Sequence, residues 1–218
     1  GLIEIGIPFS DPTAEGPVIL EADTRALAAG TKIKDIFAML ARVREKTRIP
    51  MVFLTYANLI FTYGRDKFFQ QCRDVEIDGV IVPDVPFEEK ATIAPEAEKY
   101  GVEIISMIAP TSHQRIQSIA REAQGYIYLV SSLGVTGVRK EITTNLKEIV
   151  EKIREVSDKP IAVGFGISTP EQAKEMAEIS DGAIVGSAIV KLCAQYGKDC
   201  VEPVKQYVKE MAEAVDEA

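Results

Sequence analysis

Three acidic residues lie in the first seventeen residues of the chain, where their surroundings could support acid–base chemistry. Glu4 stands in the middle of a short apolar run, and Asp11 and Glu15 follow in a loop rich in Pro, Gly and Ser. A carboxyl group donates and accepts protons near neutral pH when burial raises its pKa. The segment therefore indicates a proton-transfer site, provided that the fold buries one of these acids.

The position of Glu4 depends on the fold. Glu4 and its neighbours alternate with Ile3, Ile5 and Ile7, which is the period of a β-strand. If the isoleucines pack under a helix, Glu4 points the other way. In a one-sided sheet that face is water, and the acid has no special meaning. In a closed parallel barrel it is the crowded interior, where an unpaired carboxylate is costly and usually functional.

Glycine-rich turns form a second candidate site. Gly164 and Gly166 follow one apolar run, and Gly186 follows the next and precedes Ser187 and a helical pattern. Glycines let backbone N–H groups approach an anion, and a helix N-terminus adds partial positive charge. Eightfold barrels repeatedly build a phosphate site from the loops after strands seven and eight and a short extra helix. The alternative is that these glycines only form tight turns, but two such turns on consecutive units favour phosphate binding.

Two further residues have a structural and a functional interpretation. Asp84 lies between Pro83 and Pro86 and either caps a helix or contacts a ligand at a strand end. Tyr128 lies in a predicted strand, where its ring either packs in the core or carries a phenol to the mouth of a barrel.

Composition excludes two classes of partner. The chain has 218 residues, a formal net charge of −8 and 46% hydrophobic residues. An acidic chain without a basic face predicts no nucleic-acid binding and no binding to an anionic membrane. Its apolar runs are all shorter than the roughly 18 residues that cross a membrane.

Cysteine and histidine content bears on location and on metals. Cys72, Cys193 and Cys200 do not form a disulfide framework, and their odd number indicates a reducing cytoplasm. Their spacing fits no zinc pattern, and His113 is the only histidine. We therefore expect no metal site and no cofactor.

Strands alternate with helices along the chain. Apolar runs predict seven strands, at residues 3–7, 51–55, 80–82, 102–107, 126–131, 161–165 and 183–185. Helical periodicity predicts helices at residues 18–29, 33–46, 65–75, 88–100, 112–123, 144–156, 170–179, 187–196 and 202–218. Residues 56–58 are interpreted as the start of a loop.

This alternation predicts an α/β fold with a parallel sheet and right-handed crossovers. An open doubly wound sheet and a closed (β/α)8 barrel both fit. The glycines follow the last two strands rather than the first, which favours the barrel. Without linkers or charge blocks, residues 1–218 are predicted to form a single barrel domain.

Several collinear segments resemble the tryptophan synthase alpha chain family. The first is the segment from Glu4 to Pro12, and the resemblance extends to the terminal helix. The other matching segments are Glu15-Gly16-Pro17, Tyr56-Ala57-Asn58, Asp84-Val85-Pro86, Gly134-Val135-Thr136-Gly137, Gly164-Phe165-Gly166-Ile167-Ser168 and Gly186-Ser187-Ala188-Ile189-Val190.

The resemblance implies a (β/α)8 TIM barrel that cleaves indole-3-glycerol phosphate to indole and glyceraldehyde 3-phosphate, a retro-aldol reaction of L-tryptophan biosynthesis. Glu4 aligns with the family's general acid/base. Glu15 aligns with a position that is usually Asp and that accepts a hydrogen bond from the indole N–H. Tyr128 aligns with a tyrosine beside the substrate.

The resemblance also assigns binding and partner residues. The phosphate cradle comprises Gly137, Phe165, Gly166, Gly186 and Ser187. Thr136 belongs to a loop that closes over the site. Pro8 and Asp11 are assigned to the interface with a tryptophan synthase beta chain, in an expected alpha2beta2 complex.

Two departures from the family pattern matter. Glu15 reaches one methylene further than Asp, and a misplacement of about 1 Å can cost about 100-fold in rate. The family has a βα unit before the segment that opens this chain, so the barrel is expected to lack its first unit and to be N-terminally incomplete. A rearranged seven-stranded barrel is the alternative.

Competing functions are weaker. Sugar-phosphate epimerases of this shape need metal-binding histidines, and nucleotide decarboxylases need a Lys/Asp array in one strand; neither is present. A non-catalytic partner that binds a phosphate ligand and regulates a beta chain is the remaining alternative.

Overall fold

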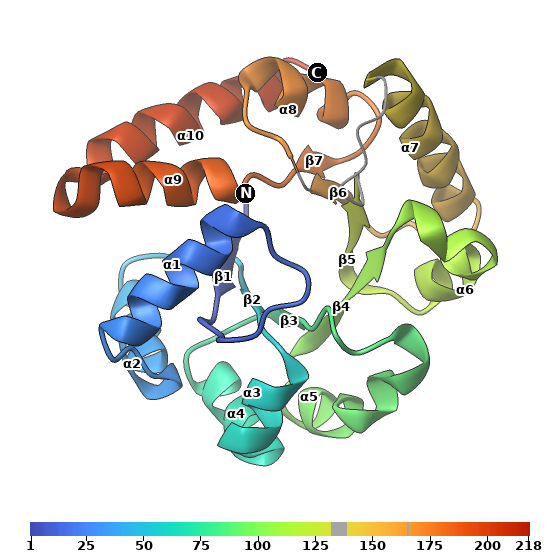
Figure 1. The fold of residues 1–218 in the computed structure, drawn as a ribbon. Coiled ribbons are helices and arrows are strands. Elements are labelled where there is room, and N and C mark those ends of the chain that lie inside the picture. The colour runs from blue at the N-terminus through green and yellow to red at the C-terminus, as the bar shows by residue number, and fades with distance from the viewer. Residues whose placement is uncertain (132–138, 165) are drawn as a thin grey trace. The chain divides into compact units, whose positions relative to one another are not determined.

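The computed structural model describes residues 1–131, 139–164 and 166–218 (Figure 1). Chain contacts divide them into two compact units, Gly1–Ile105 and Ser106–Ala218. Strands and helices alternate in both units. Each strand runs parallel to the strand with which it pairs. No helix of the described residues is long and apolar enough to cross a membrane.

Unit 1 contains three complete strands and the start of a fourth. They pair in chain order, with Glu4 opposite Val52 and Gly79 opposite Glu103. The strands are β1 (Ile3–Gly6), β2 (Met51–Leu54), β3 (Gly79–Ile81) and β4 (Glu103–Ile108), whose last three residues belong to unit 2. The helices are α1 (Pro17–Ala28), α2 (Ile33–Arg44), α3 (Ala57–Tyr63), α4 (Arg65–Asp74), the 3-10 helix η1 (Phe87–Thr92) and α5 (Ala94–Tyr100).

Aromatic residues form the centre of the unit 1 core. Phe37 of α2 meets Phe53 of β2 and Phe68 of α4 edge-on, at centroid distances of 5.6 and 5.8 Å. Phe68 contacts Phe69 in the same way at 5.4 Å. Each fully buried Phe contributes about 1.5–3 kcal/mol, and edge-to-face pairs add about 0.5–1.5 kcal/mol. This cluster fixes β2 against the helices that cover it.

Unit 2 contains the end of β4 and three further strands. Tyr128 lies opposite Ala162, and Val163 lies opposite Ala183. The strands are β5 (Gln124–Val130), β6 (Ile161–Gly164) and β7 (Gly182–Ala183). The helices are η2 (Pro110–Arg115), α6 (Ile116–Arg121), α7 (Arg139–Arg154), α8 (Pro170–Ala177), α9 (Ser187–Tyr196), η3 (Gly197–Asp199) and α10 (Val201–Asp216).

All seven predicted strands are present, but four helices differ from prediction. The helix predicted at residues 144–156 is α7, which begins at Arg139. Residues 57–63 form α3, where the sequence indicated a loop. The predicted helix 88–100 is split into η1 and α5, because Pro95 lies in the first turn of α5 and cannot continue a preceding helix. The predicted helix 112–123 begins as 3-10 helix and is α-helical only from Ile116.

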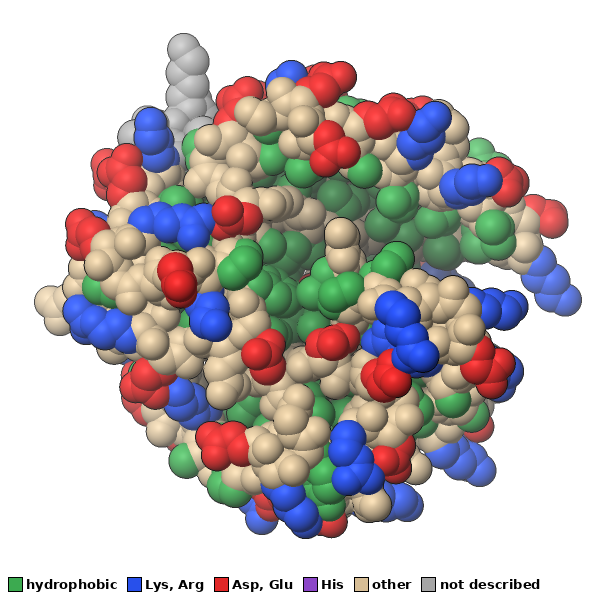
Figure 2. Space-filling model, turned by 180° about the vertical axis from the view of Figure 1, so that it is seen from behind, with side chains coloured by type: hydrophobic (Ala, Val, Ile, Leu, Met, Phe, Trp, Pro, Cys, Tyr) green, Lys and Arg blue, Asp and Glu red, His purple; other side chains and the backbone are tan. Residues whose placement is uncertain are grey.

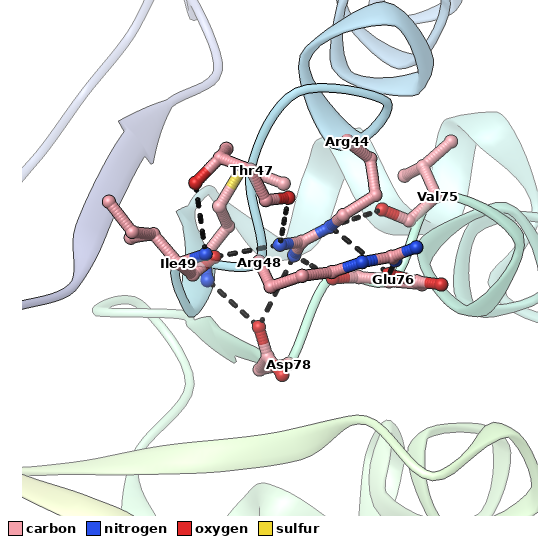
Figure 3. A network of polar contacts seen from close by, with 8 residues as sticks. Arg44, Thr47, Arg48, Ile49, Val75, Glu76 and Asp78 are labelled. Atoms are coloured by element: carbon pink, nitrogen blue, oxygen red, sulfur yellow. Dashed lines mark hydrogen bonds and ion pairs between the residues drawn. The ribbon is translucent and has the colours of Figure 1, made fainter.

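Arg44 connects the beginnings of β2 and β3 (Figure 3). Its buried guanidinium donates to the carbonyl of Ile49 at 2.7 Å and to that of Glu76, and lies 3.5 Å from the Asp78 carboxylate. The same carboxylate accepts a hydrogen bond from Met51 N at 2.8 Å. One Arg and one Asp thereby hold two neighbouring strands in register.

A matching arrangement occurs in unit 2. Arg154 donates to the carbonyl of Lys159 at 3.0 Å and pairs with Asp181, whose carboxylate accepts from Ile161 N at 2.7 Å. In both units the Arg lies six residues before a proline, and the Asp directly precedes a glycine that begins or adjoins a strand. In both units an Arg and an Asp thus hold the start of a strand in place.

Acidic and basic side chains are interspersed on the face of the molecule seen in Figure 2. Hydrophobic side chains are visible among them, in the middle of this view as well as near its edge.

We expect Asp78→Ala to lower the free energy of unfolding by about 1–2 kcal/mol, because Met51 N and buried Arg44 lose an acceptor. Urea unfolding measures the change. The control is Asp74→Ala, which removes an exposed acid paired with adjacent Arg73 and should change stability by less than about 0.5 kcal/mol. Equal effects of the two substitutions would contradict the role of Asp78.

Candidate active site

Glu4 lies at the centre of β1 with its carboxyl group directed into buried space. Its Oε2 is inaccessible to solvent and has no hydrogen-bond partner among the described residues. Burial raises the pKa of Glu4 to about 7. The predicted alternation holds in part, since Ile7 is buried and Ile5 packs on the core, whereas Ile3 is 42% exposed. A carboxyl group with this pKa exists in both protonation states at neutral pH.

Glu15 is held in the loop between β1 and α1. Its Oε1 accepts a hydrogen bond from the Tyr56 hydroxyl at 3.2 Å, and the same hydroxyl accepts from Ala14 N at 3.2 Å. Phe9 stacks on the Tyr56 ring with centroids 5.1 Å apart. The pKa of Glu15 is raised to about 7, chiefly by burial, then by the Asp23 carboxyl and least by the charge of Glu4, while the Tyr56 hydrogen bond lowers it.

Asp23 is a site residue that the sequence interpretation missed. It is 7% exposed and is the only residue of α1 that is fully buried. Burial raises its pKa, while contacts with the Glu15 carboxyl and the Phe9 backbone favour the ionised form. The inward face of α1 runs through Ile19, Asp23 and Ala26, so the helical spacing of an acid among apolar residues was the available signal.

The remaining acids of the opening segment and of unit 1 have other surroundings. Both oxygens of Asp84 accept from Ala57 N, at 3.0 and 3.2 Å, so this acid caps α3. Asp11 is exposed and accepts a hydrogen bond from the Ser10 hydroxyl. Pro8 is partly buried in the same loop. The structural interpretation of Asp84 is confirmed.

In unit 2, the turns after β6 and β7 leave open space at their glycines. Gly166 has φ +77°, which favours glycine, and a Cβ at Gly166 or Gly186 would meet no described residue within 4 Å. Gly186 is the N-cap of α9, and none of the described side chains caps this helix. The backbone N–H groups of the first turn, beginning at exposed Ser187, are therefore available to an anion.

The turn after β6 is fixed from two sides. The Tyr207 hydroxyl of α10 donates to the carbonyl of Ser168 at 2.9 Å, and Ser168 N donates to Gln172 Oε1 at 2.8 Å. Thr169 caps α8 by accepting from Gln172 N. The predicted cradle and loop residues Phe165, Gly137 and Thr136 lie outside the described residues.

The side chain of Tyr128 in β5 lies against Gly164 of the neighbouring strand β6. Tyr128 is 6% exposed, and a Cβ added at Gly164 would lie 2.3 Å from its hydroxyl oxygen and 2.5 Å from Cζ. A glycine at position 164 is therefore required for the phenol to take this place. Both interpretations of Tyr128 remain open on this geometry, because the ring is packed and its hydroxyl lies near the end of the strand.

The family model for the tryptophan synthase alpha chain matches residues 1–216. The alpha chain of Lacticaseibacillus casei is 48% identical over 215 residues, which are 99% of this chain and 81% of the relative. The chain belongs to the tryptophan synthase alpha chain family.

Solved structures agree with this assignment. The alpha subunit from Campylobacter jejuni has a TM-score of 0.87 at 36% identity, covering 96% of this chain and 83% of that one. A structure described as the tryptophan synthase a2b2 complex from Pyrococcus furiosus has a TM-score of 0.88 at 33% identity, covering 98% and 87%.

Membership of the tryptophan synthase alpha family confirms the predicted family, the predicted lyase class and the role in tryptophan biosynthesis. The predicted parallel α/β fold is confirmed as well, with seven strands among the described residues and a close match to TIM-barrel relatives. The individual site residues are not tested by these comparisons. Within unit 1 the structure brings Glu4 and Glu15 together and adds Asp23 and Tyr56.

We expect Gly164→Ala to destabilise the protein by about 1–3 kcal/mol, because the added methyl overlaps the Tyr128 phenol. Thermal or urea unfolding measures the loss. Gly182→Ala on the next strand is the control, since its Cβ would meet no described residue within 4 Å. In the Tyr128→Leu background the cost of Gly164→Ala should shrink. An undiminished cost there would contradict the overlap.

Proposed function

We propose that the chain cleaves indole-3-glycerol phosphate with Glu4 as the general acid/base. The observation that carries this proposal is the buried carboxyl of Glu4, whose Oε2 has no partner among the described residues and whose pKa is near 7. A group with this pKa can protonate a carbon and then accept a proton from a hydroxyl without a large penalty in either step.

The proposed reaction begins with protonated Glu4. Its proton goes to the indole ring carbon that carries the glycerol chain, which leaves a positive charge on the ring nitrogen. The Glu4 carboxylate then takes the proton of the adjacent glycerol hydroxyl. The carbon–carbon bond breaks, its electron pair restores the indole ring, and the hydroxyl carbon becomes the aldehyde of glyceraldehyde 3-phosphate. Glu4 ends protonated, as it began.

We assign Glu15 to the indole N–H. The Tyr56 hydroxyl donates to Oε1 of Glu15, and a carboxylate oxygen can accept a second hydrogen bond. The second acceptor site of this oxygen is suited to a ligand N–H, because a buried carboxylate gains from each hydrogen bond. A negative charge at this position also stabilises the positive charge that develops on the ring. Tyr128 is proposed to lie beside the substrate.

The phosphate group is assigned to the turns at Gly166 and Gly186 with Ser187, and the same proposal includes Gly137 and Phe165. Support comes from the open space at the two described glycines and from the uncapped N-terminus of α9. Neither turn contains a Lys or Arg between residues 164 and 168 or at residues 186 and 187, so backbone N–H groups would bind the phosphate.

The same proposal covers assembly and location. We propose that the chain forms an alpha2beta2 complex with a tryptophan synthase beta chain through the loop containing Pro8 and exposed Asp11. The relative from Pyrococcus furiosus is described as such a complex. We further propose a single barrel domain over residues 1–218 and a cytoplasmic location, the latter in keeping with three free cysteines.

We expect Glu4→Gln to reduce indole release from indole-3-glycerol phosphate by at least about 100-fold, because Gln cannot transfer the proton. Indole formation is measured at substrate saturation, and glycerol phosphate binding by calorimetry should stay unchanged. Glu103→Gln, an exposed acid on β4, is the matched control and should keep full turnover. Equal turnover in Glu4→Gln and the wild type would refute the assignment of Glu4.

We expect Ser187→Asp to raise the KM for indole-3-glycerol phosphate by about 10- to 100-fold with a smaller change in kcat, because it adds negative charge where α9 begins. Steady-state kinetics measures both constants. The control is Ser157→Asp. Ser157 precedes β6, at the end of that strand opposite to the Gly166 turn, so this substitution should leave KM unchanged. An unchanged KM in Ser187→Asp would exclude phosphate from the N-terminus of α9.

A further inference from the structure

The buried acid of α1 has no structural explanation in its own helix. Asp23 lies on the inward face of α1 between Ile19 and Ala26, in a position that normally carries an apolar side chain. At 7% exposure it is more deeply buried than Glu15, which is half-buried. None of the groups that influence its pKa is a cation, so burial is not offset by an ion pair.

The unpartnered oxygens of the two acids make a specific arrangement. Oδ2 of Asp23 and Oε2 of Glu15 are both buried, and neither has a hydrogen-bond partner among the described residues when both acids are treated as acceptors. Each side chain nevertheless changes the pKa of the other, Asp23 raising that of Glu15 and Glu15 lowering that of Asp23, as two carboxyl groups do when they lie within hydrogen-bonding reach. Ionised carboxylates only accept hydrogen bonds, so such a contact requires a proton on one of them.

We propose that Glu15 and Asp23 share one proton, and that Asp23 is a positioning residue that holds the Glu15 carboxyl in place. The pair then carries a single negative charge. The shared proton lies between the two orphan oxygens, while Oε1 of Glu15 accepts from Tyr56 and keeps a second acceptor site for the indole N–H. This inference rests on the proposed role of Glu15, which it deepens by naming what orients that carboxyl and limits its charge.

The groups that face the pair agree with this arrangement. Glu4 adds negative charge, which opposes full ionisation of Glu15. The Tyr56 hydroxyl favours the ionised form of Glu15, and the Phe9 backbone favours the ionised form of Asp23. Two carboxyls in one buried site cannot both ionise readily, so one proton is retained while the other is lost.

The direct test detects the shared proton by infrared spectroscopy, independently of activity. The Glu4→Gln variant serves as the background, because Glu4 also binds a proton near pH 7. The carbonyl band of a protonated carboxylic acid should be present there at pH 7. It should disappear when either Asp23→Asn or Glu15→Gln is added, since an amide partner donates to the remaining carboxylate. If Asp23→Asn does not fold, Glu15→Gln gives the same readout.

The functional test is the pH profile of kcat/KM in otherwise wild-type protein. Asp23→Asn should retain kcat within about 10-fold and move the acidic limb down by at least one pH unit, because the amide stabilises ionised Glu15. Asp23→Leu, which cannot hydrogen-bond, should lower kcat/KM by about 100-fold. Glu21→Gln removes an exposed acid from the same helix and should leave the profile unchanged.

Each outcome has one meaning. A carboxylic acid band that survives Asp23→Asn, or a pH profile that Asp23→Asn leaves in place, would overturn the shared proton. A band that disappears as expected while Glu15→Gln keeps full activity supports the shared proton and overturns only the catalytic role of Glu15.

Discussion

The site of unit 1 depends on the burial of three carboxyl groups. No cation is among the groups that set their pKa values. A buried carboxylate is costly, so Glu4, Glu15 and Asp23 retain protons at pH values where exposed acids have lost them. The aromatic core holds β2 and Tyr56 in place, and Tyr56 in turn holds Glu15. Packing energy of the surrounding unit thus maintains an arrangement that the acids alone would not adopt.

Glycine serves two opposite purposes in unit 2. At Gly166 and Gly186 no atom of the described residues lies where a Cβ would be, which leaves room for a ligand to approach the backbone. At Gly164 the space is filled by the Tyr128 phenol, so the missing side chain of one strand admits the ring of its neighbour. The residues of the Gly164–Gly166 segment are therefore not interchangeable, although the sequence presents them as one motif.

Stability and chemistry are assigned to opposite ends of the strands. The anchors formed by Arg44 with Asp78 and by Arg154 with Asp181 lie where strands begin. The proposed phosphate turns and the loop that carries Glu15 lie where strands end. Parallel strands with crossover helices separate these ends along the chain, which lets loops at one end vary while residues at the other preserve register.

The sequence by itself determined the strand–helix alternation, the glycine turns and the candidacy of Glu4, because periodicity and glycine placement are local properties. It did not predict α3, whose first N–H is capped by Asp84 from 27 residues away. Nor did it identify Asp23, which looked like one polar position in a helix. Only the tertiary structure decided that Asp23 is buried against Glu15, because burial and pKa depend on groups brought together from distant parts of the chain.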